Sequence, residues 1–193
     1  MAEAGRVIAG LAAGRHLLAP GPATRPLADR VKQTLFAILE PDLPGATVLD
    51  LFAGSGAAGI EALSRGAAKA VFVDRDGAAI RTIRENLRRT GLDGPAARVI
   101  QTGVLEWLAR RAGQGGPFTI AIVDPPYAET ELLMSALARL GGESTGLLDS
   151  GGRVVAKHFW RSAPPERVGL LRSERVRRFG ETALTFYRAV GDD

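Results

Sequence analysis

The sequence predicts a doubly wound α/β fold with a mostly parallel, seven-stranded sheet, and three observations support this. From Thr47 onward, short apolar runs alternate with segments of helical periodicity, which favours parallel strands joined by helices. A glycine-rich segment, Gly54–Gly59, directly follows the first apolar run and predicts a tight turn from strand to helix. Two alternating segments around Gly180 predict an antiparallel hairpin that closes the sheet.

The first 46 residues follow a different pattern. Arg6–Ala9 and Arg15–Leu18 are short alternating segments around a glycine-containing turn, and they predict a β-hairpin. After a proline-rich loop, residues 28–39 place apolar side chains at helical spacing. We therefore predict an appendage of hairpin and helix, residues 1–46, in front of one compact domain, residues 47–193.

Each predicted strand of the domain is a short apolar run, and each predicted helix carries an apolar stripe. The strands are Val48–Leu49, Ala70–Val73, Arg98–Ile100, Phe118–Val123, Arg153–Ala156, Arg175–Arg178 and Ala183–Arg188. The helices are Gly59–Ser64, Ala78–Thr90, Val104–Arg111 and Glu131–Leu140.

Composition narrows the class of protein. The 193 residues are 46% hydrophobic, enough for one sizeable core. The chain has no cysteine and two histidines, so we expect no metal-dependent mechanism. No apolar run is long enough to span a membrane and the N-terminus does not resemble a signal peptide, so we expect a soluble cytoplasmic protein, as a monomer.

Charge permits a polyanionic partner without requiring one. The net charge is +4, and residues 153–193 hold nine Lys and Arg against five Asp and Glu. A solvated, arginine-rich surface explains the same numbers equally well.

The glycine-rich turn predicts a nucleoside-containing ligand. Gly54, Gly56 and Gly59 have the GxGxxG spacing, which by itself suits a dinucleotide as well as S-adenosylmethionine. Asp50 at the strand end favours the second, because S-adenosylmethionine is cationic and carries no phosphate. Asp74 ends the next strand, where a carboxylate can accept hydrogen bonds from a ribose diol. The predicted cofactor-binding residues here are Asp50, Phe52, Ala53, Gly54, Ser55, Gly56 and Asp74.

A second motif, Asp124-Pro125-Pro126-Tyr127, follows the apolar run Phe118–Val123 at a strand's carboxyl end, where ligands bind in open α/β sheets. The two prolines have no N–H, so this loop presents acceptors. The Asp124 carboxylate and the Pro125 carbonyl can accept both N–H bonds of an exocyclic amine and direct its lone pair at a methyl donor. Tyr127 can stack on the base. These four residues are the predicted catalytic residues.

With these motifs the chain resembles class I amino-methyltransferases, and more narrowly the bacterial family that methylates the N2 amine of guanine 966 in 16S ribosomal RNA. The resemblance covers nearly the whole chain. It includes Arg6–Gly10, Gly14-Arg15, Thr24-Arg25-Pro26, Asp29-Arg30-Val31 and Gly59–Gly66.

The resemblance implies a Rossmann-like fold, S-adenosylmethionine as cofactor, and 16S ribosomal RNA or the small ribosomal subunit as partner. It also implies that Thr24 and Arg25 border the active site. Two positions depart from the family pattern. Gly103, beside Val104, stands where relatives often carry an acidic residue near the adenine, so Gly103 and Val104 are expected to bind it through the backbone. Lys157 stands where relatives usually show glutamate, and we expect a local charge change there that faces RNA without loss of activity.

An active site of this kind reaches only an unpaired or flipped base, so nearby basic residues are expected to hold phosphates. The predicted RNA-contacting residues are Arg6, Arg15, Thr24, Arg25, Arg177 and Arg178, and Arg161, Arg167, Arg172 and Arg175 are further candidates. By contrast, Arg81, Arg84, Arg88 and Arg89 are expected on a solvated helix face, and Trp107 and Trp160 in or near the core.

Three other functions stay open at this point: a DNA adenine-N6 methyltransferase, an NAD-dependent oxidoreductase, and a non-catalytic RNA-binding assembly factor. The chain leaves little room for a domain that reads duplex DNA, which disfavours the first.

Overall fold

The computed structural model describes residues 3–21, 28–111, 117–126, 128–142 and 145–190. Thr24, Arg25 and Tyr127 therefore lie outside the described residues. The chain forms two compact units, residues 1–103 and 104–193. The predicted boundary between residues 46 and 47 stays a prediction.

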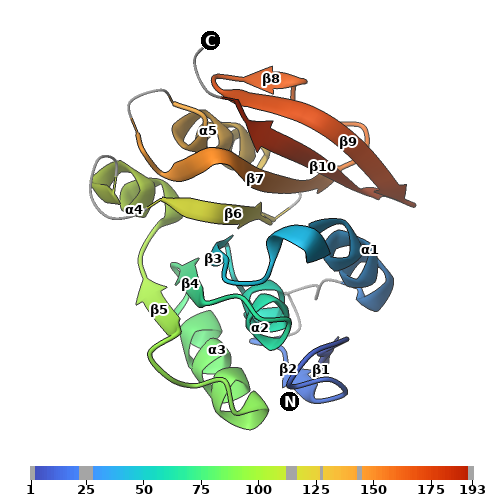
Figure 1. Cartoon of the computed structure of the whole chain (residues 1–193), viewed down its shortest axis with the longest axis vertical. Helices are drawn as coiled ribbons and strands as arrows, with labels where there is room; N and C mark the ends of the chain where they lie inside the picture. The colour runs from blue at the N-terminus through green and yellow to red at the C-terminus, as the bar shows by residue number, and fades with distance from the viewer. Residues whose placement is uncertain (1–2, 22–27, 112–116, 127, 143–144, 191–193) are drawn as a thin grey trace. The chain divides into compact units, whose positions relative to one another are not determined.

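The first unit contains a parallel sheet in the order β5-β4-β3 (Figure 1). Its elements are β3 (Thr47–Leu51), α2 (Ala57–Ser64), β4 (Lys69–Asp74), α3 (Gly77–Thr90) and β5 (Ala97–Gln101). Every residue of α2 is buried. Gly59 makes this close packing possible, because a Cβ there would lie 2.3 Å from the ring of Phe72 on β4.

Helix α3 shows how local sequence sets an element's ends. The Asp76 side chain accepts a hydrogen bond from Ala78 N–H at 2.9 Å and caps the start, and Gly91 ends the helix at φ 70°. Ile80, Ile83 and Leu87 are buried against the sheet. The predicted solvated face is confirmed, since the exposed side chains include Arg81, Arg84, Arg88 and Arg89.

The N-terminal residues of this unit form the predicted hairpin and helix. The elements are β1 (Glu3–Arg6), β2 (His16–Leu18), α1 (Asp29–Leu39) and the 3-10 turn η1 (Glu40–Asp42). The hairpin lies beside α2 and α3 (Figure 1). At its turn, Leu11 N–H donates to the Ser64 carbonyl and Ala12 N–H to Ser64 Oγ. A side chain at Gly10 would meet Ser64 O at 1.8 Å, so the turn requires glycine.

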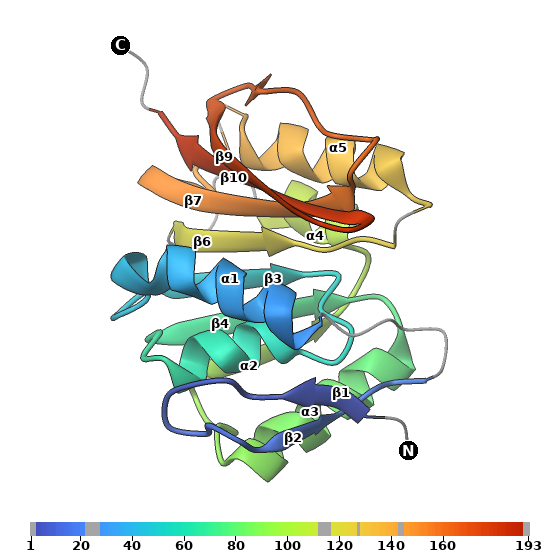
Figure 2. The same cartoon turned by 90° about the vertical axis from the view of Figure 1, so that its right-hand side faces the viewer.

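The second unit pairs its strands in the order β6-β7-β10-β9-β8. Its elements are α4 (Val104–Arg111), β6 (Phe118–Val123), α5 (Thr130–Leu140), β7 (Leu148–Phe159), β8 (Arg167–Val168), β9 (Leu171–Phe179) and β10 (Thr182–Ala189). β6 and β7 are parallel, and the other pairs are antiparallel. α5 covers one face of β7 (Figure 2).

The predicted elements are present, with four corrections. The first strand of the hairpin is Glu3–Arg6 and not Arg6–Ala9, because residues 7–14 form the turn. β9 has nine residues where four were predicted, because its pairing with β10 extends beyond the alternating segment. β7 has 12 residues where four were predicted, because glycines and polar residues interrupt its apolar pattern. β8 was not predicted, since two residues carry no periodicity; the part of the chain that the structure describes thus has eight strands besides the hairpin, where seven were predicted. None of the described helices is long and apolar enough to cross a membrane.

Candidate functional site

The loop between β3 and α2 carries the backbone strain expected of a binding loop. Phe52 has φ 59°, the one positive φ of a non-glycine residue among those described. Gly54 and Gly56 follow at φ 54° and 75°. A Cβ at Gly56 would lie 3.2 Å from the Ile83 side chain, so α3 packs against the loop. Strained backbone of this kind clusters where a ligand is held.

Two carboxylates hold this loop. Asp74 Oδ2 accepts a hydrogen bond from Gly54 N–H at 2.9 Å, and Asp74 Oδ1 accepts one from Asp76 N–H. Asp50 is 2% exposed and accepts Gly59 N–H at 2.9 Å, next to the positive end of α2. Residues 50–59 include no Lys or Arg. This set of donors and acceptors fits a cationic nucleoside such as S-adenosylmethionine better than a dinucleotide, whose pyrophosphate would meet the carboxylates.

Asn86 on α3 connects the loop to the hairpin, and the sequence did not indicate this role. Its side-chain amide donates to the Ser55 carbonyl and to the Leu18 carbonyl, both at 2.9 Å. Its Oδ1 accepts Leu18 N–H at 2.8 Å. The hairpin therefore braces the candidate cofactor loop through one fully buried side chain.

Glu61 on α2 anchors the same hairpin. Its carboxylate accepts Ile8 N–H at 2.7 Å, Ala9 N–H at 3.0 Å and Arg65 Nε–H at 2.8 Å. Lys32 Nζ lies 3.9 Å away, and both the Lys32 and Glu61 side chains are fully buried. Lys32 also donates to the Arg6 carbonyl, and burial lowers its pKa from the usual 10.5. The family resemblance includes Glu61 within Gly59–Gly66 but implies no role for it.

The second candidate site is at the carboxyl end of β6, where Asp124 follows the buried run Ile120–Val123. Asp124 Oδ1 accepts a hydrogen bond from Lys157 Nζ at 2.6 Å. Burial raises the pKa of the Asp124 carboxyl above its usual range, and the Lys157 ammonium offsets part of that rise. Pro125 and Pro126, together with Glu129, Lys157 and His158, line a small hollow here.

The placement of Lys157 does not support the prediction that it faces RNA. Its side chain is 11% exposed and is directed at Asp124, because β7 continues past the end of β6 and places Lys157 beside the aspartate. A lysine that binds an RNA phosphate would need its ammonium group to project into solvent.

The structure shows where other predicted cofactor residues lie in the fold. Ala53 N–H donates to the Val73 carbonyl at 3.2 Å, which holds the loop on β4. Gly103 is half-buried at the end of the first unit, and Val104 is buried at the start of α4. Their contact with adenine stays a prediction.

Of the predicted RNA-contacting arginines, those on the hairpin already have protein partners. Arg15 Nη1 donates to the Arg89 carbonyl at the end of α3, and Arg6 lies 3.7 Å from Asp29. Arg177 and Arg178 are exposed on β9. The Arg178 guanidinium lies 3.6 Å from the ring centroid of Trp160 and that of Arg161 4.9 Å.

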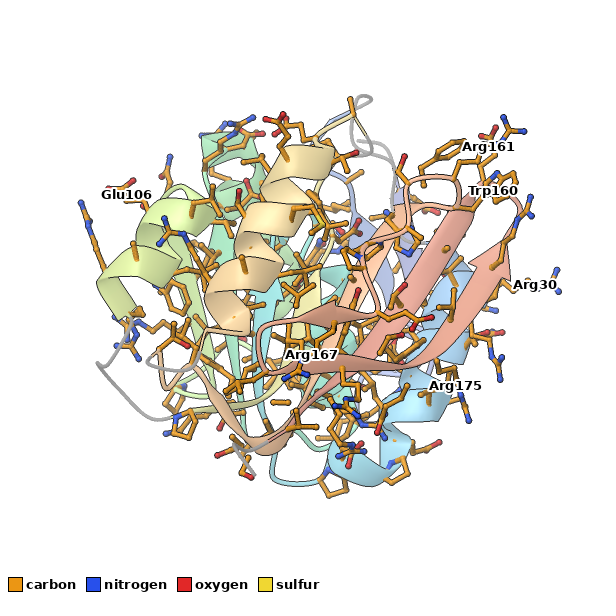
Figure 3. The ribbon with its side chains drawn as sticks, turned by 90° about the horizontal axis from the view of Figure 1, so that it is seen from above. Arg30, Glu106, Trp160, Arg161, Arg167 and Arg175 are labelled. Atoms are coloured by element: carbon orange, nitrogen blue, oxygen red, sulfur yellow. The ribbon has the colours of Figure 1, made fainter. Side chains whose placement is uncertain are left out.

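These side chains lie along β9. Trp160 and Arg161 lie together near one end, Arg167 lies near the other, and Arg175 projects between them (Figure 3). Trp160 is half-buried and Trp107 buried, as predicted.

Comparisons with known proteins agree with this geometry. The model of a family described as "Conserved hypothetical protein 95" matches residues 5–188. The chain belongs to that family. It is 40% identical to "Putative rRNA methyltransferase YlbH" of Bacillus subtilis, over 96% of this chain and 100% of that one. It is 43% identical to "Ribosomal RNA small subunit methyltransferase D" of Escherichia coli, an alignment covering 63% of this chain and 60% of that one.

A solved member of similar fold is "Putative methyltransferase yhhF" of Escherichia coli, with TM-score 0.85 and 33% identity, covering 97% of this chain and 98% of that one. The family resemblance and the predicted fold class, a mostly parallel α/β methyltransferase sheet with an antiparallel C-terminal hairpin, are confirmed.

Proposed function

We propose that this chain transfers the methyl group of S-adenosylmethionine to the N2 amine of a guanine in 16S ribosomal RNA. The coarser statement, an S-adenosylmethionine-dependent methyltransferase of small-subunit ribosomal RNA, has the support of the relatives' names and of the shared fold. The choice of the guanine N2 amine rests on the Asp124 motif and the family resemblance. We also propose that the chain acts as a cytoplasmic monomer without a metal.

One observation carries the proposal: the Asp124 carboxylate stands at a strand's carboxyl end, its Oδ1 accepts a hydrogen bond from Lys157, and no described residue donates to its Oδ2. Pro125 and Pro126 follow and add no N–H donors. Oδ2 and the Pro125 carbonyl are then two acceptors for the two N–H groups of one amine. We assign Asp124, Pro125 and Pro126 to this role, and Tyr127 to stacking on the base.

The chemistry follows from those acceptors. The lone pair of an exocyclic amine is delocalised into the ring, so the nitrogen is a poor nucleophile. Two accepted N–H bonds hold it nearer to tetrahedral geometry and direct the lone pair out of the ring plane. Bound S-adenosylmethionine supplies an electrophilic methyl on a sulfonium. Asp124 also stabilises the positive charge that the nitrogen gains, and the proton leaves to water after transfer.

On the cofactor side we assign Asp50, Phe52, Ala53, Gly54, Ser55, Gly56, Asp74, Gly103 and Val104. The strained loop allows close approach of its backbone, and Asp74 retains lone pairs beyond those used by Gly54 and Asp76 for a ribose diol. Asp50 acts by stabilising the loop's helix, since its buried carboxylate is bonded to Gly59 N–H.

The deciding experiment is a methyl-transfer assay with labelled S-adenosylmethionine. Small ribosomal subunits from a strain lacking this methylation, their naked 16S RNA, large subunits and adenine-rich DNA serve as substrates. We expect label in small-subunit RNA alone, recovered as N2-methylguanosine after digestion and mass spectrometry. Label in DNA alone, or tight binding of NAD in place of S-adenosylmethionine, would refute the proposal. Gel filtration at assay concentration tests the monomer.

The RNA surface is proposed to include Arg6, Arg15, Thr24, Arg25, Arg177 and Arg178. Replacing Arg177 and Arg178 by Gln should raise the KM for RNA about tenfold and reduce the slope of log affinity against log salt by about 1 to 2. The matched control is Arg84→Gln, which removes an exposed arginine from α3. Equal effects of the two changes would mean that β9 is not a specific RNA surface.

A further inference from the structure

The Asp124 side chain lacks the local support that an aspartate in a turn usually has. An Asp in such a position ordinarily accepts a hydrogen bond from the backbone N–H two residues on. Here that residue is Pro126, and the residue before it is Pro125, so neither has an N–H. Holding the carboxylate in one rotamer therefore requires a donor from elsewhere in the fold.

Lys157 supplies that donor because of strand register. Val123, the last residue of β6, is paired with Ala156 on β7, so the next residue of each chain segment is Asp124 and Lys157. β7 runs on to Phe159 because β10 still pairs with it, Leu184 opposite Lys157 and Thr182 opposite Phe159. The lysine is thus fixed on a rigid strand and reaches Asp124 Oδ1 at 2.6 Å.

The pair is only partly shielded from solvent. The Lys157 side chain is 11% exposed and that of Asp124 25%. No other hydrogen bond or ion pair of the Asp124 carboxylate involves the residues that the structure describes. One oxygen is thereby held and the other left for a ligand.

We propose that Lys157 is the positioning residue of the methyl transfer, because it holds Asp124 by Oδ1 so that Oδ2 accepts the amine N–H. This inference rests on the proposed function. Lys157 itself does not touch the substrate. It replaces, from a neighbouring strand, the backbone donors that the two prolines remove.

Other charged groups near the pair must be separated from it in a test. His158 on β7 donates from Nδ1 to the Phe159 carbonyl and accepts from Thr185 Oγ1 at Nε2, and burial lowers its pKa. Glu129, ahead of α5, lines the same hollow. On β9, Arg177 lies in the same cross-strand row, opposite Leu184.

The test compares Lys157→Met, Lys157→Gln and Lys157→Arg under saturating S-adenosylmethionine. We expect Lys157→Met to lower kcat about 30- to 100-fold with the KM for RNA changed less than twofold. The acid limb of its kcat profile should move to higher pH, because Asp124 has lost its counter-charge. Lys157→Gln keeps a donor without the charge, so it should recover part of kcat at high pH while keeping the shifted limb. Lys157→Arg should restore the wild-type limb.

Two controls exclude a merely structural role. Arg153→Met removes another partly buried cation of β7, one paired with Glu174, and should leave both kcat and the acid limb unchanged. Adding Lys157→Met to Asp124→Asn should cause no further loss of kcat, because the lysine acts through the aspartate. Calorimetric binding of S-adenosylmethionine shows whether each variant is folded.

The outcomes distinguish this inference from the proposed function. A wild-type protein that methylates no RNA refutes the function itself. The role of Lys157 is refuted, and the function stands, if the wild type is active and a variant matches it. The match must be in both kcat and the acid limb, and it applies to Lys157→Met or, if that variant does not fold, to Lys157→Gln. Additive losses in the double variant also overturn the inference.

Discussion

Two carboxylates of this chain each pair with a lysine, yet their surroundings differ. Glu61 in the first unit accepts two backbone N–H groups and Arg65 Nε–H, with Lys32 alongside, and it is fully buried. Asp124 in the second unit has Lys157 as its partner among the described residues and is 25% exposed. The first carboxylate is saturated by the fold, whereas the second retains an acceptor.

The difference shows how the same pair of residue types serves two purposes. A saturated buried carboxylate ties chain segments together, since removing any partner leaves an uncompensated charge. A carboxylate with a remaining acceptor at a strand's carboxyl end contributes little cohesion and is available to a ligand. Changes at Asp124 should therefore affect chemistry, and changes at Glu61 should affect stability.

The largest expected effect is that of Asp124→Asn on catalysis. The amide keeps the shape of the side chain but loses the charge that stabilises the transition state, so kcat/KM should fall about 10³-fold, or about 4 kcal/mol. The melting temperature should move by only a few degrees. Asp149→Asn, a partly buried aspartate of β7, is the control. More than a tenth of wild-type kcat/KM in Asp124→Asn would contradict its assignment.

Next in size is the effect of Glu61→Gln on stability. Arg65 and Lys32 lose their buried counter-charge, and the free energy of unfolding in urea should drop by about 3 kcal/mol. Glu106→Gln removes an exposed pair with Arg110 and should cost less than about 0.5 kcal/mol. Equal stability of Glu61→Gln and Glu106→Gln would mean that Glu61, with Arg65 and Lys32, does not anchor the hairpin.

A smaller effect is expected on the pH dependence of activity. The amine needs ionised Asp124, and burial raises the pKa of that carboxyl, so kcat should fall as pH drops through a value above the usual range for aspartate. Stability changes in the opposite direction, because a raised pKa favours the folded state only while the carboxyl is protonated. His158→Gln should retain the acid limb of the kcat profile. If this variant lacked the acid limb, the limb would belong to the histidine.

The smallest expected effect concerns Lys32. Burial lowers its pKa, so between that lowered value and about 10.5 the unfolded chain binds more protons and stability rises with pH. The stability advantage of the wild type over Lys32→Met should thus be larger at pH 9.5 than at pH 7.5, measured by urea unfolding. Lys69→Met, at an exposed position, should show no such trend. An advantage that shrinks with pH would contradict the sign.

Much of the architecture was predictable because its causes are local. Helix α4 was predicted at its observed bounds and the other helices at nearly theirs, from periodicity and terminal residues such as Asp76 and Gly91. The bounds of β1, β7 and β9 differ more from the prediction. The two motifs follow apolar runs directly, so their positions at strand ends could be read along the chain. β8 and the full length of β7 could not be predicted, because their strand partners define them and the local pattern does not.

The sequence by itself determined the fold class and the residue types at the candidate site. Tertiary structure decided which side chains support them. Asn86 reaches Leu18 across 68 positions of the chain, Glu61 reaches Ile8 across 53, and Lys157 reaches Asp124 across 33. The two prolines after Asp124 show in the sequence that it lacks nearby backbone N–H donors. Strand register alone places Lys157 beside it. Hydrogen-bond partners so distant in sequence leave no periodic signal, which is why they emerge only when the chain is folded.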